Sequence, residues 1–246
     1  WLNGSLVDWQ DAKIHILSHG LHYGGSVFEG ERAYGGKIFK SRQHSERFLK
    51  SAEYLDFQIP YTVDELIEAK QLVVDKNGFK NCYVRPVAWR GSEMMAVAAQ
   101  MAKIHTAIAV WDWPSMFDIN TKMKGIKLDI AEYRRPDPAT APSHSKAAGL
   151  YMICTISKHK AERKGYADAL MLDWQGRVAE CTGANIFFTR DGVLHTPIAD
   201  CFLNGITRQT VRDRPPHRRI EVVERAIWQS EFTSAGPWFL AGSAAS

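Results

Sequence analysis

The first half of the chain alternates between helical and strand-like spacing of its apolar residues. Residues 48–55 carry apolar side chains at the spacing of one helical face. Thr62-Val-Asp-Glu65 is a capping box, in which the threonine hydroxyl and the glutamate carboxylate each satisfy a free backbone N–H, and Asn77-Gly78 ends the helix that follows. Two runs rich in β-branched and aromatic residues come next, at 82–89 and 104–111. This pattern predicts an α+β layer.

The second half is dominated by strand patterns joined by short turns. Residues 126–133 predict a strand, and the apolar spacing from 147 to 165 predicts a helix. The turns Trp174-Gln-Gly176 and Asp191-Gly192 each separate two short apolar runs, which is typical of two successive hairpins. A proline and several polar residues break the periodicity between the halves. We therefore predict two domains: a small α/β domain over 1–113, a linker over 114–122 and a larger β-rich domain over 123–246.

Composition and charge narrow the classes of function. The 246 residues are 45% hydrophobic, and the 31 basic and 27 acidic side chains give a net charge of +4. The charges are mixed along the chain, which argues against a nucleic-acid partner. We interpret the basic run 208–219 as a solvated face without a function of its own.

Other sequence features favour a protein of the cytoplasm. No apolar run reaches the roughly 20 residues needed to span a bilayer, and the first residues lack the pattern of a signal peptide, so we expect no membrane partner. The cysteines are too far apart for a zinc site or a redox motif, and we expect buried free thiols and no metal. They are Cys82, Cys154, Cys181 and Cys201.

Two ionisable residues stand in apolar surroundings and could do chemistry. Lys146 follows a proline-bearing loop and opens the predicted helix, where a lysine most commonly lies along the surface with its amine in water. Glu180 ends a short apolar strand, where an exposed carboxylate is the common interpretation. Spacing alone leaves the surface and the functional interpretation of both residues open.

A family resemblance favours the functional interpretation. Ser143-His-Ser-Lys146-Ala-Ala-Gly-Leu-Tyr151, Val178-Ala-Glu180-Cys-Thr-Gly-Ala-Asn185 and Asn204-Gly-Ile-Thr207-Arg resemble the fold-type IV pyridoxal-phosphate enzymes. Among these, the chain is most similar to the branched-chain amino acid aminotransferases of the class IV family, over about 1–246. The resemblance implies a fold like that of D-amino acid aminotransferase and pyridoxal 5′-phosphate as cofactor. It also implies ping-pong transfer of nitrogen from Leu, Ile or Val to 2-oxoglutarate.

The same resemblance assigns the residues that hold the cofactor. Lys146 would form the internal aldimine and then move the proton at the substrate α-carbon. Glu180 would keep the pyridine nitrogen protonated. Tyr151, on nearly the same face of the predicted helix as Lys146, would bond the phenolate oxygen. The phosphate and its surroundings would be bound by Arg47, Leu203, Gly205, Ile206, Thr207 and Ser243.

Substrate binding is implied mainly in the first half of the chain. The resemblance puts Tyr23 and Phe28 beside the substrate side chain, where aromatic walls suit branched apolar groups. Tyr83 and Arg85 alternate on one strand and face the same way. By resemblance they bind substrate carboxylates, with Arg85 receiving the distal carboxylate of glutamate. Ala244 would donate its N–H to the substrate carboxylate. The expected partners are amino acids, 2-oxo acids and a second copy of the chain, as a homodimer or a higher homo-oligomer.

Two features depart from the family pattern and keep other functions open. Pro215-Pro216 would end the helix after the phosphate turn early. The chain ends at Ser246, where relatives continue with further strands and a last helix, so we expect a truncated chain or an incomplete domain. The alternatives are a D-amino acid or amine transaminase, an aminodeoxychorismate lyase, and a weakly active remnant that binds pyridoxal phosphate. The Tyr83-x-Arg85 pair argues against the lyase.

Overall fold

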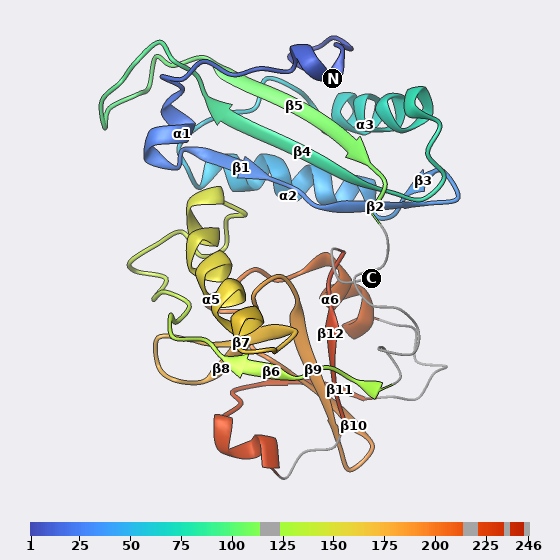
Figure 1. The fold of residues 1–246 in the computed structure, drawn as a ribbon, viewed down its shortest axis with the longest axis vertical. Helices are drawn as coiled ribbons and strands as arrows, with labels where there is room; N and C mark the ends of the chain where they lie inside the picture. The colour runs from blue at the N-terminus through green and yellow to red at the C-terminus, as the bar shows by residue number, and fades with distance from the viewer. Residues whose placement is uncertain (114–123, 214–220, 234–236, 244–246) are drawn as a thin grey trace. The chain divides into compact units, whose positions relative to one another are not determined.

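The computed structural model describes residues 1–113, 124–213, 221–233 and 237–243. Contacts divide the chain into two compact units (Figure 1). Unit 1 is Trp1–Pro114 with Ser145–Leu150, and unit 2 is Ser115–His144 with Tyr151–Ser246. The segment that carries Lys146 therefore belongs to unit 1, although the residues on both sides of it belong to unit 2. The linker proposed at 114–122 lies outside the described residues.

Unit 1 is an antiparallel sheet with helices. The long strand β4 pairs with β5 along one edge and with β1 and then β2 along the other, and β3 pairs with β2. The elements are η1 (Trp9–Asp11), α1 (His19–Tyr23), β1 (Ser26–Phe28), β2 (Glu31–Tyr34), β3 (Lys37–Ile38), α2 (Ser41–Glu53), α3 (Val63–Asn77), β4 (Cys82–Arg90) and β5 (Ile104–Trp111).

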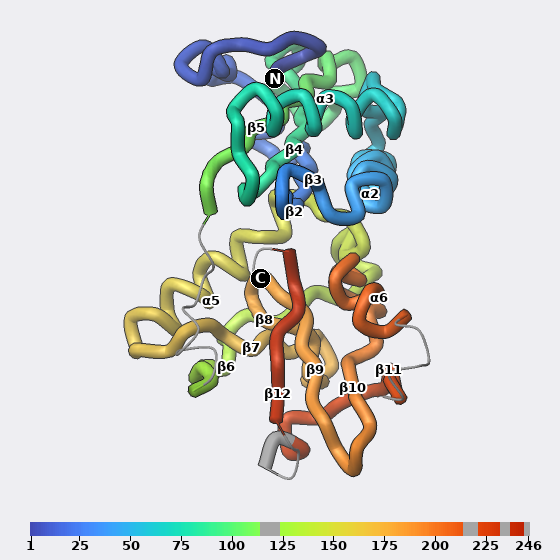
Figure 2. The backbone as a smooth tube through the Cα atoms, turned by 90° about the vertical axis from the view of Figure 1, so that its right-hand side faces the viewer, coloured from blue at the N-terminus to red at the C-terminus, as the bar shows by residue number. Residues whose placement is uncertain are grey.

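The helices α2 and α3 lie side by side on one face of this sheet (Figure 2). Phe48 of α2 and Leu66 of α3 pack with Ala88 of β4, and Val84 of β4 packs with further residues of α3. Side chains alternate along a strand. Tyr83 and Arg85 consequently project from the opposite face of β4, as the alternation predicted.

The helix start and stop signals of unit 1 are confirmed. Thr62 Oγ1 accepts from the Glu65 N–H and the Glu65 carboxylate accepts from the Thr62 N–H, so the capping box begins α3. Gly78 ends the helix with φ of 70°, a left-handed conformation that glycine adopts at little cost.

In its described residues, unit 2 contains two sheets and the helices α5 and α6. One sheet has the order β11-β10-β9-β12 and the other β6-β7-β8, and α5 packs on β6 and β7. Both predicted hairpins are present as antiparallel pairs, β7 with β8 and β9 with β10. The elements are β6 (Leu128–Ile130), η2 (Ala148–Tyr151), α5 (Met152–Arg163), β7 (Asp168–Leu172), β8 (Val178–Cys181), β9 (Asn185–Arg190), β10 (Val193–Pro197), α6 (Ile206–Arg212), β11 (Val222–Arg225), η4 (Gln229–Thr233) and β12 (Trp238–Ala241).

The fold class is confirmed as α+β, but two predicted elements are shorter. The strand expected over 126–133 is reduced to β6, because only Leu128 to Ile130 pair with β7. The helix expected from 147 begins as the short η2, and α5 starts at Met152.

The thiol prediction is also confirmed, since all four cysteines are buried and free. Among the described residues, every helix is too short or too polar to cross a lipid bilayer.

Candidate functional site

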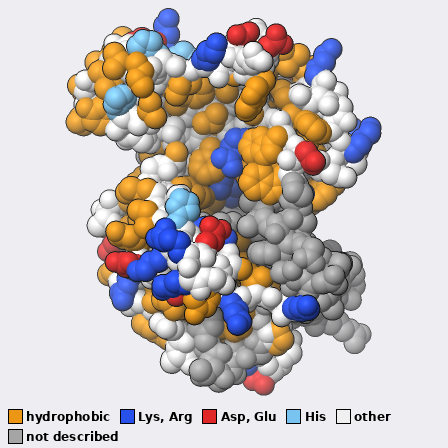
Figure 3. All heavy atoms as spheres, in the orientation of Figure 1, with side chains coloured by type: hydrophobic (Ala, Val, Ile, Leu, Met, Phe, Trp, Pro, Cys, Tyr) orange, Lys and Arg blue, Asp and Glu red, His pale blue; other side chains and the backbone are white. Residues whose placement is uncertain are grey.

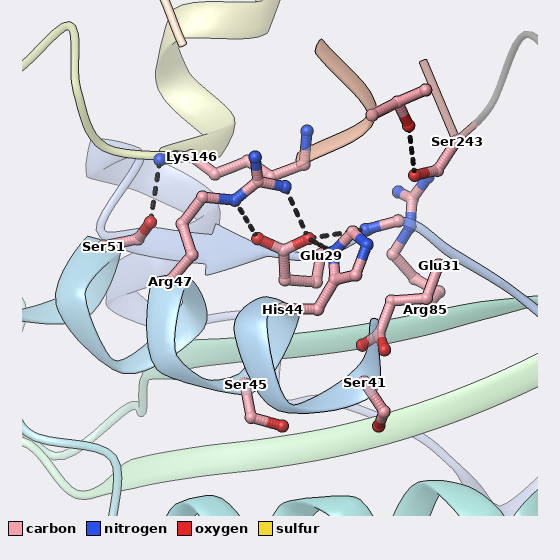
Figure 4. A network of polar contacts seen from close by, with 12 residues as sticks. Glu29, Glu31, Ser41, His44, Ser45, Arg47, Ser51, Arg85, Lys146 and Ser243 are labelled. Carbon is pink, nitrogen blue, oxygen red and sulfur yellow. Dashed lines mark hydrogen bonds and ion pairs between the residues drawn. The ribbon is translucent and has the colours of Figure 1, made fainter. Parts of the chain in front are cut away.

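Lys146 belongs to unit 1 and precedes the short helix η2, which begins at Ala148, so the prediction that Lys146 itself opens the helix is wrong. Ala147 forms a β-bridge with Val27, and the Phe28 N–H donates to the Lys146 carbonyl over 3.1 Å. The Lys146 N–H donates to Ser51 Oγ of α2 over 3.0 Å (Figure 4). The Lys146 Nζ lies 4.9 Å from the centre of the Phe28 ring. Bonds to β1 and α2 therefore fix the backbone of this lysine.

Arg47, the arginine expected at the phosphate, projects from α2 in the same unit. Its Nε and Nη2 donate to the Glu29 carboxylate over 2.6 and 2.8 Å (Figure 4). The Arg47 side chain is 16% exposed, whereas Glu29 is completely buried. The guanidinium is thus held in one orientation by a buried acid.

Arg85 is surrounded by aromatic rings. Its guanidinium carbon lies 4.6 Å from the ring centre of Phe28, 5.2 Å from that of Tyr83 and 5.9 Å from that of Trp111. Its Nη2 donates to the Tyr83 hydroxyl over 3.0 Å. Within the described part of the chain, no acidic side chain forms an ion pair with Arg85, and its buried Nε has no hydrogen-bond partner. The cluster of Phe28, Tyr83, Arg85 and Trp111, here the aromatic cluster, offers apolar walls and one cation.

The backbone at Gly30 is packed against this cluster. A Cβ at position 30 would lie 2.0 Å from the Tyr83 hydroxyl, so only glycine leaves that hydroxyl in place. Tyr23 was also expected beside the substrate side chain. It ends α1, where its ring stacks on His19 at 4.7 Å and is 50% exposed.

Glu180 lies on β8 of unit 2 and is nearly buried, with 12% of its side chain exposed. Arg135 Nε is 3.4 Å from Glu180 Oε1, and Asn185 Nδ2 donates to Glu180 Oε2 over 3.2 Å. Asn185 also donates to the Leu203 carbonyl over 3.2 Å. The carboxylate is therefore held from two sides, and the interpretation of Glu180 as an exposed strand-end residue is wrong.

Arg135 supplies the positive charge for this carboxylate. Burial works to lower the pKa of Arg135, but the neighbouring Glu180 raises the pKa above its ordinary value. Arg135 Nη1 also donates to Cys154 Sγ over 3.5 Å, and burial raises the pKa of that thiol to about 11. The thiol therefore stays neutral at physiological pH, and Glu180 is the acidic partner of Arg135.

The residues expected at the phosphate turn lie at the start of α6. Gly205 is the N-cap, Ile206 begins the helix, and Thr207 Oγ1 is 3.4 Å from Ser243 Oγ. A Cβ at Gly205 would lie 2.1 Å from Asn185 Oδ1. The turn thus packs directly on the side chain that holds Glu180.

The basic run 208–219 does not begin on a solvated face, so this interpretation is wrong at Arg208. Its side chain is fully buried, and it donates to Asn204 Oδ1 over 2.7 Å, to the Pro197 carbonyl over 2.8 Å and to Glu224. These bonds tie α6 to β10 and β11.

The prediction that Tyr151 shares a helical face with Lys146 is also wrong. Lys146 lies before η2 and is not helical, whereas Tyr151 ends η2 and precedes the first turn of α5. Ala244 and Pro215-Pro216 lie outside the described residues.

Sequence reasoning missed Glu29 and Arg135. Arg135 stands in a loop between Arg134 and Pro136, with no periodicity that separates it from a solvated arginine. Glu29 directly follows the apolar pair Val27-Phe28, and a buried acid at this position requires a charged partner, which the sequence does not identify.

Comparison with known proteins identifies the family. The model of the class IV amino-transferases matches residues 26–246. A probable branched-chain-amino-acid aminotransferase of Rickettsia felis is 44% identical over 99% of this chain and 83% of its own length. The crystal structure of the Escherichia coli branched-chain amino acid aminotransferase superposes with a TM-score of 0.95 at 35% identity, over 100% of this chain and 83% of that chain.

A third structure is that of a T.th. branched-chain amino acid aminotransferase complexed with N-(5′-phosphopyridoxyl)-L-glutamate. Its TM-score is 0.92 at 36% identity, over 100% of this chain and 82% of that chain. The resemblance read from the sequence motifs is confirmed by these matches. Since the family model covers most of the chain, the protein belongs to the class IV amino-transferases.

Proposed function

We propose that this chain transfers the amino group of a branched-chain L-amino acid to 2-oxoglutarate, with pyridoxal 5′-phosphate as cofactor. The observation that carries the substrate assignment is the aromatic cluster around Arg85. Apolar rings suit a branched side chain, and a guanidinium that forms no ion pair with an acid in the described ranges suits the distal carboxylate of glutamate. Both half-reactions require these two properties from one site.

The donor set fits pyridoxal 5′-phosphate. Lys146 offers the amine, Glu180 a nearly buried carboxylate for the ring nitrogen, and Arg47, Thr207 and Ser243 offer hydrogen-bond donors for the phosphate. Gly205 lets the backbone approach closely at the phosphate turn. The T.th. relative is described with a phosphopyridoxyl-glutamate ligand, which supports the same cofactor and the same acidic substrate here.

The bound cofactor supplies an electron sink for the charge left when the substrate loses its α-proton. Residues of the protein move and hold the protons. Lys146 Nζ moves the proton at the α-carbon, and Glu180, fixed by Arg135 and Asn185, holds the proton on the ring nitrogen. Tyr151 is proposed at the phenolate oxygen and Ala244 at the substrate carboxylate.

A substrate panel tests this function. Purified protein supplied with pyridoxal 5′-phosphate is expected to form L-glutamate from 2-oxoglutarate with L-leucine, L-isoleucine or L-valine. Turnover of D-alanine or of a simple amine in place of these would favour the D-amino acid or amine transaminase. Release of pyruvate from aminodeoxychorismate would favour the lyase, and tight cofactor binding without turnover would favour the remnant.

Arg85→Gln is expected to lower kcat/KM for 2-oxoglutarate at least about 30-fold, because the distal carboxylate loses its charged partner. The value for L-leucine should change less than about 5-fold, because an apolar side chain gains nothing from the guanidinium. Steady-state kinetics with each substrate varied in turn measure both values. Equal losses for the two substrates would instead make Arg85 a structural residue.

We also propose that the protein acts as at least a dimer. Exposed apolar side chains gather at the end of unit 1 that carries α1 (Figure 3), and the His19 Nε2 contact with the Ala96 carbonyl, at 3.0 Å, joins α1 to the 95–101 loop. Exposed apolar side chains that gather on one surface are typical of protein–protein contact sites. It comprises Leu17, Leu21, Tyr23, Met95, Val97 and Met101.

Light scattering of the purified protein is expected to give at least twice the mass of one chain. Val97→Asp, which puts a charge on this patch, is expected to shift the population toward monomers, while Val7→Asp, at an apolar residue outside the patch, should leave the mass unchanged. A wild-type monomer at micromolar concentration would contradict the proposal.

A further inference from the structure

Glu29 is a buried acid to which the proposed reaction gives no role. Its side chain is completely buried, as is the neighbouring His44 side chain at 1% exposure. Glu29 Oε1 accepts from Arg47 Nε over 2.6 Å, and Oε2 accepts from Arg47 Nη2 over 2.8 Å. His44 Nδ1 lies 2.7 Å from Oε2 (Figure 4). Both oxygens of one carboxylate are thus occupied by two side chains of the same helix.

This arrangement keeps the acid charged despite its burial. Burial by itself raises the pKa of Glu29, but Arg47 and then His44 outweigh it and hold the pKa below its ordinary value. A two-point contact between a carboxylate and a guanidinium also fixes the plane of the guanidinium. An arginine on a helix surface otherwise samples many rotamers, which costs free energy when a ligand selects one of them.

The same helix also fixes the segment that carries the lysine amine. His44, Arg47 and Ser51 recur at the spacing of one face of α2. Ser51 Oγ accepts from the Lys146 N–H, and the Ser51 carbonyl accepts from Ser145 Oγ over 2.8 Å. Glu29 directly follows Phe28, whose N–H donates to the Lys146 carbonyl. Glu29, the residue that follows β1, therefore bonds Arg47 through its carboxylate, while its neighbour Phe28 bonds the Lys146 segment through the backbone.

We propose that Glu29, supported by His44, is a positioning residue that aims Arg47 at the cofactor phosphate. It acts through Arg47 and contacts neither the substrate nor the reacting atoms. This inference rests on the proposed function, because that function supplies the phosphate. It implies that Glu29 sets the preference of the protein for a phosphorylated aldehyde over the same aldehyde without phosphate.

Comparing the dissociation constants of two aldehydes distinguishes this positioning role from a structural role. Dissociation constants of pyridoxal 5′-phosphate and of pyridoxal are measured by titrating cofactor-free protein and following absorbance. Glu29→Gln is expected to weaken binding of pyridoxal 5′-phosphate about 10- to 100-fold, because the Arg47 guanidinium is then no longer fixed in the orientation that contacts the phosphate. Binding of pyridoxal, which carries no phosphate, is expected to change less than about 3-fold.

Matched variants control for disturbance of buried charge. Glu31 is equally buried and bonds the buried Lys70 through both oxygens at 2.9 Å, without touching Arg47. Glu31→Gln is expected to lower the melting temperature but to keep the wild-type preference for the phosphate. Glu29→Asp, which retains a charge at the same position, should fold if Glu29→Gln does not, and should reduce the preference partially. In the Arg47→Ala background, Glu29→Gln should weaken phosphate binding little further.

The outcomes separate this inference from the proposed function. Suppose that the wild type prefers pyridoxal 5′-phosphate and converts L-leucine. If Glu29→Gln then keeps the wild-type ratio of the two dissociation constants, the positioning role is overturned and the proposed function is not. A wild type that binds neither aldehyde would overturn the proposed function and this inference together.

Discussion

Lys146→Ala is expected to lower kcat for amino transfer from L-leucine at least about 10⁴-fold. Alanine removes the amine that holds the cofactor and moves the proton at the α-carbon. The bonds that orient this segment involve backbone atoms of Lys146 and Phe28 and the Ser51 hydroxyl, so the variant should fold. Single-turnover kinetics with L-leucine measure the effect.

Lys160→Ala is the matched control for this prediction. Lys160 lies on α5 with 41% of its side chain exposed and pairs with Glu132. An exposed ion pair contributes little, so kcat should stay within about 2-fold of wild type. If Lys146→Ala kept a tenth of the wild-type kcat, the assignment of Lys146 would be wrong.

The second large effect is expected for Glu180→Gln, with kcat lowered about 10²- to 10³-fold. A neutral amide cannot hold the proton on the ring nitrogen as a carboxylate does, so the carbanion charge is poorly absorbed. Arg135 and Asn185 would remain in place and could still bond the glutamine oxygen. The loss should therefore appear in the rate of the chemical step, measured in a single turnover, with a smaller change in cofactor affinity.

Glu162→Gln provides the control, because Glu162 is 54% exposed and pairs across the surface of α5 with Lys158. Its kcat should match that of the wild type. An unchanged kcat in Glu180→Gln would exclude Glu180 from the proton-holding role.

Local signals in the sequence predicted the local structure of this protein well. The capping box of Thr62 and Glu65 and the turns at Gly176 and Gly192 depend on residues close in sequence, and the structure has the expected helix and hairpins. Motif order likewise predicted the family. Neither the local cap and turn residues nor the order of the motifs depends on which distant segments of the chain contact one another.

Predictions that depended on distant contacts failed. Apolar spacing suggested that Lys146 opens a helix, but the helical residues begin at Ala148, and bonds to Phe28 and Ser51, far away in the sequence, fix the backbone of Lys146 ahead of that helix. Arg208 begins a basic run that suggested a solvated surface. In the structure its guanidinium is buried and donates hydrogen bonds to Asn204, Pro197 and Glu224. A buried charge is stable only with such partners, and the linear sequence does not show them.

The visible absorption spectrum of the wild-type protein with pyridoxal 5′-phosphate reports whether Lys146 carries the cofactor and releases it to the substrate. The band of the lysine-bound cofactor is expected to disappear on addition of L-leucine, to return on addition of 2-oxoglutarate, and to be absent in Lys146→Ala. A band that persists in Lys146→Ala, or that never responds to L-leucine in the wild type, would contradict the account of Lys146 as the residue through which amino groups are transferred.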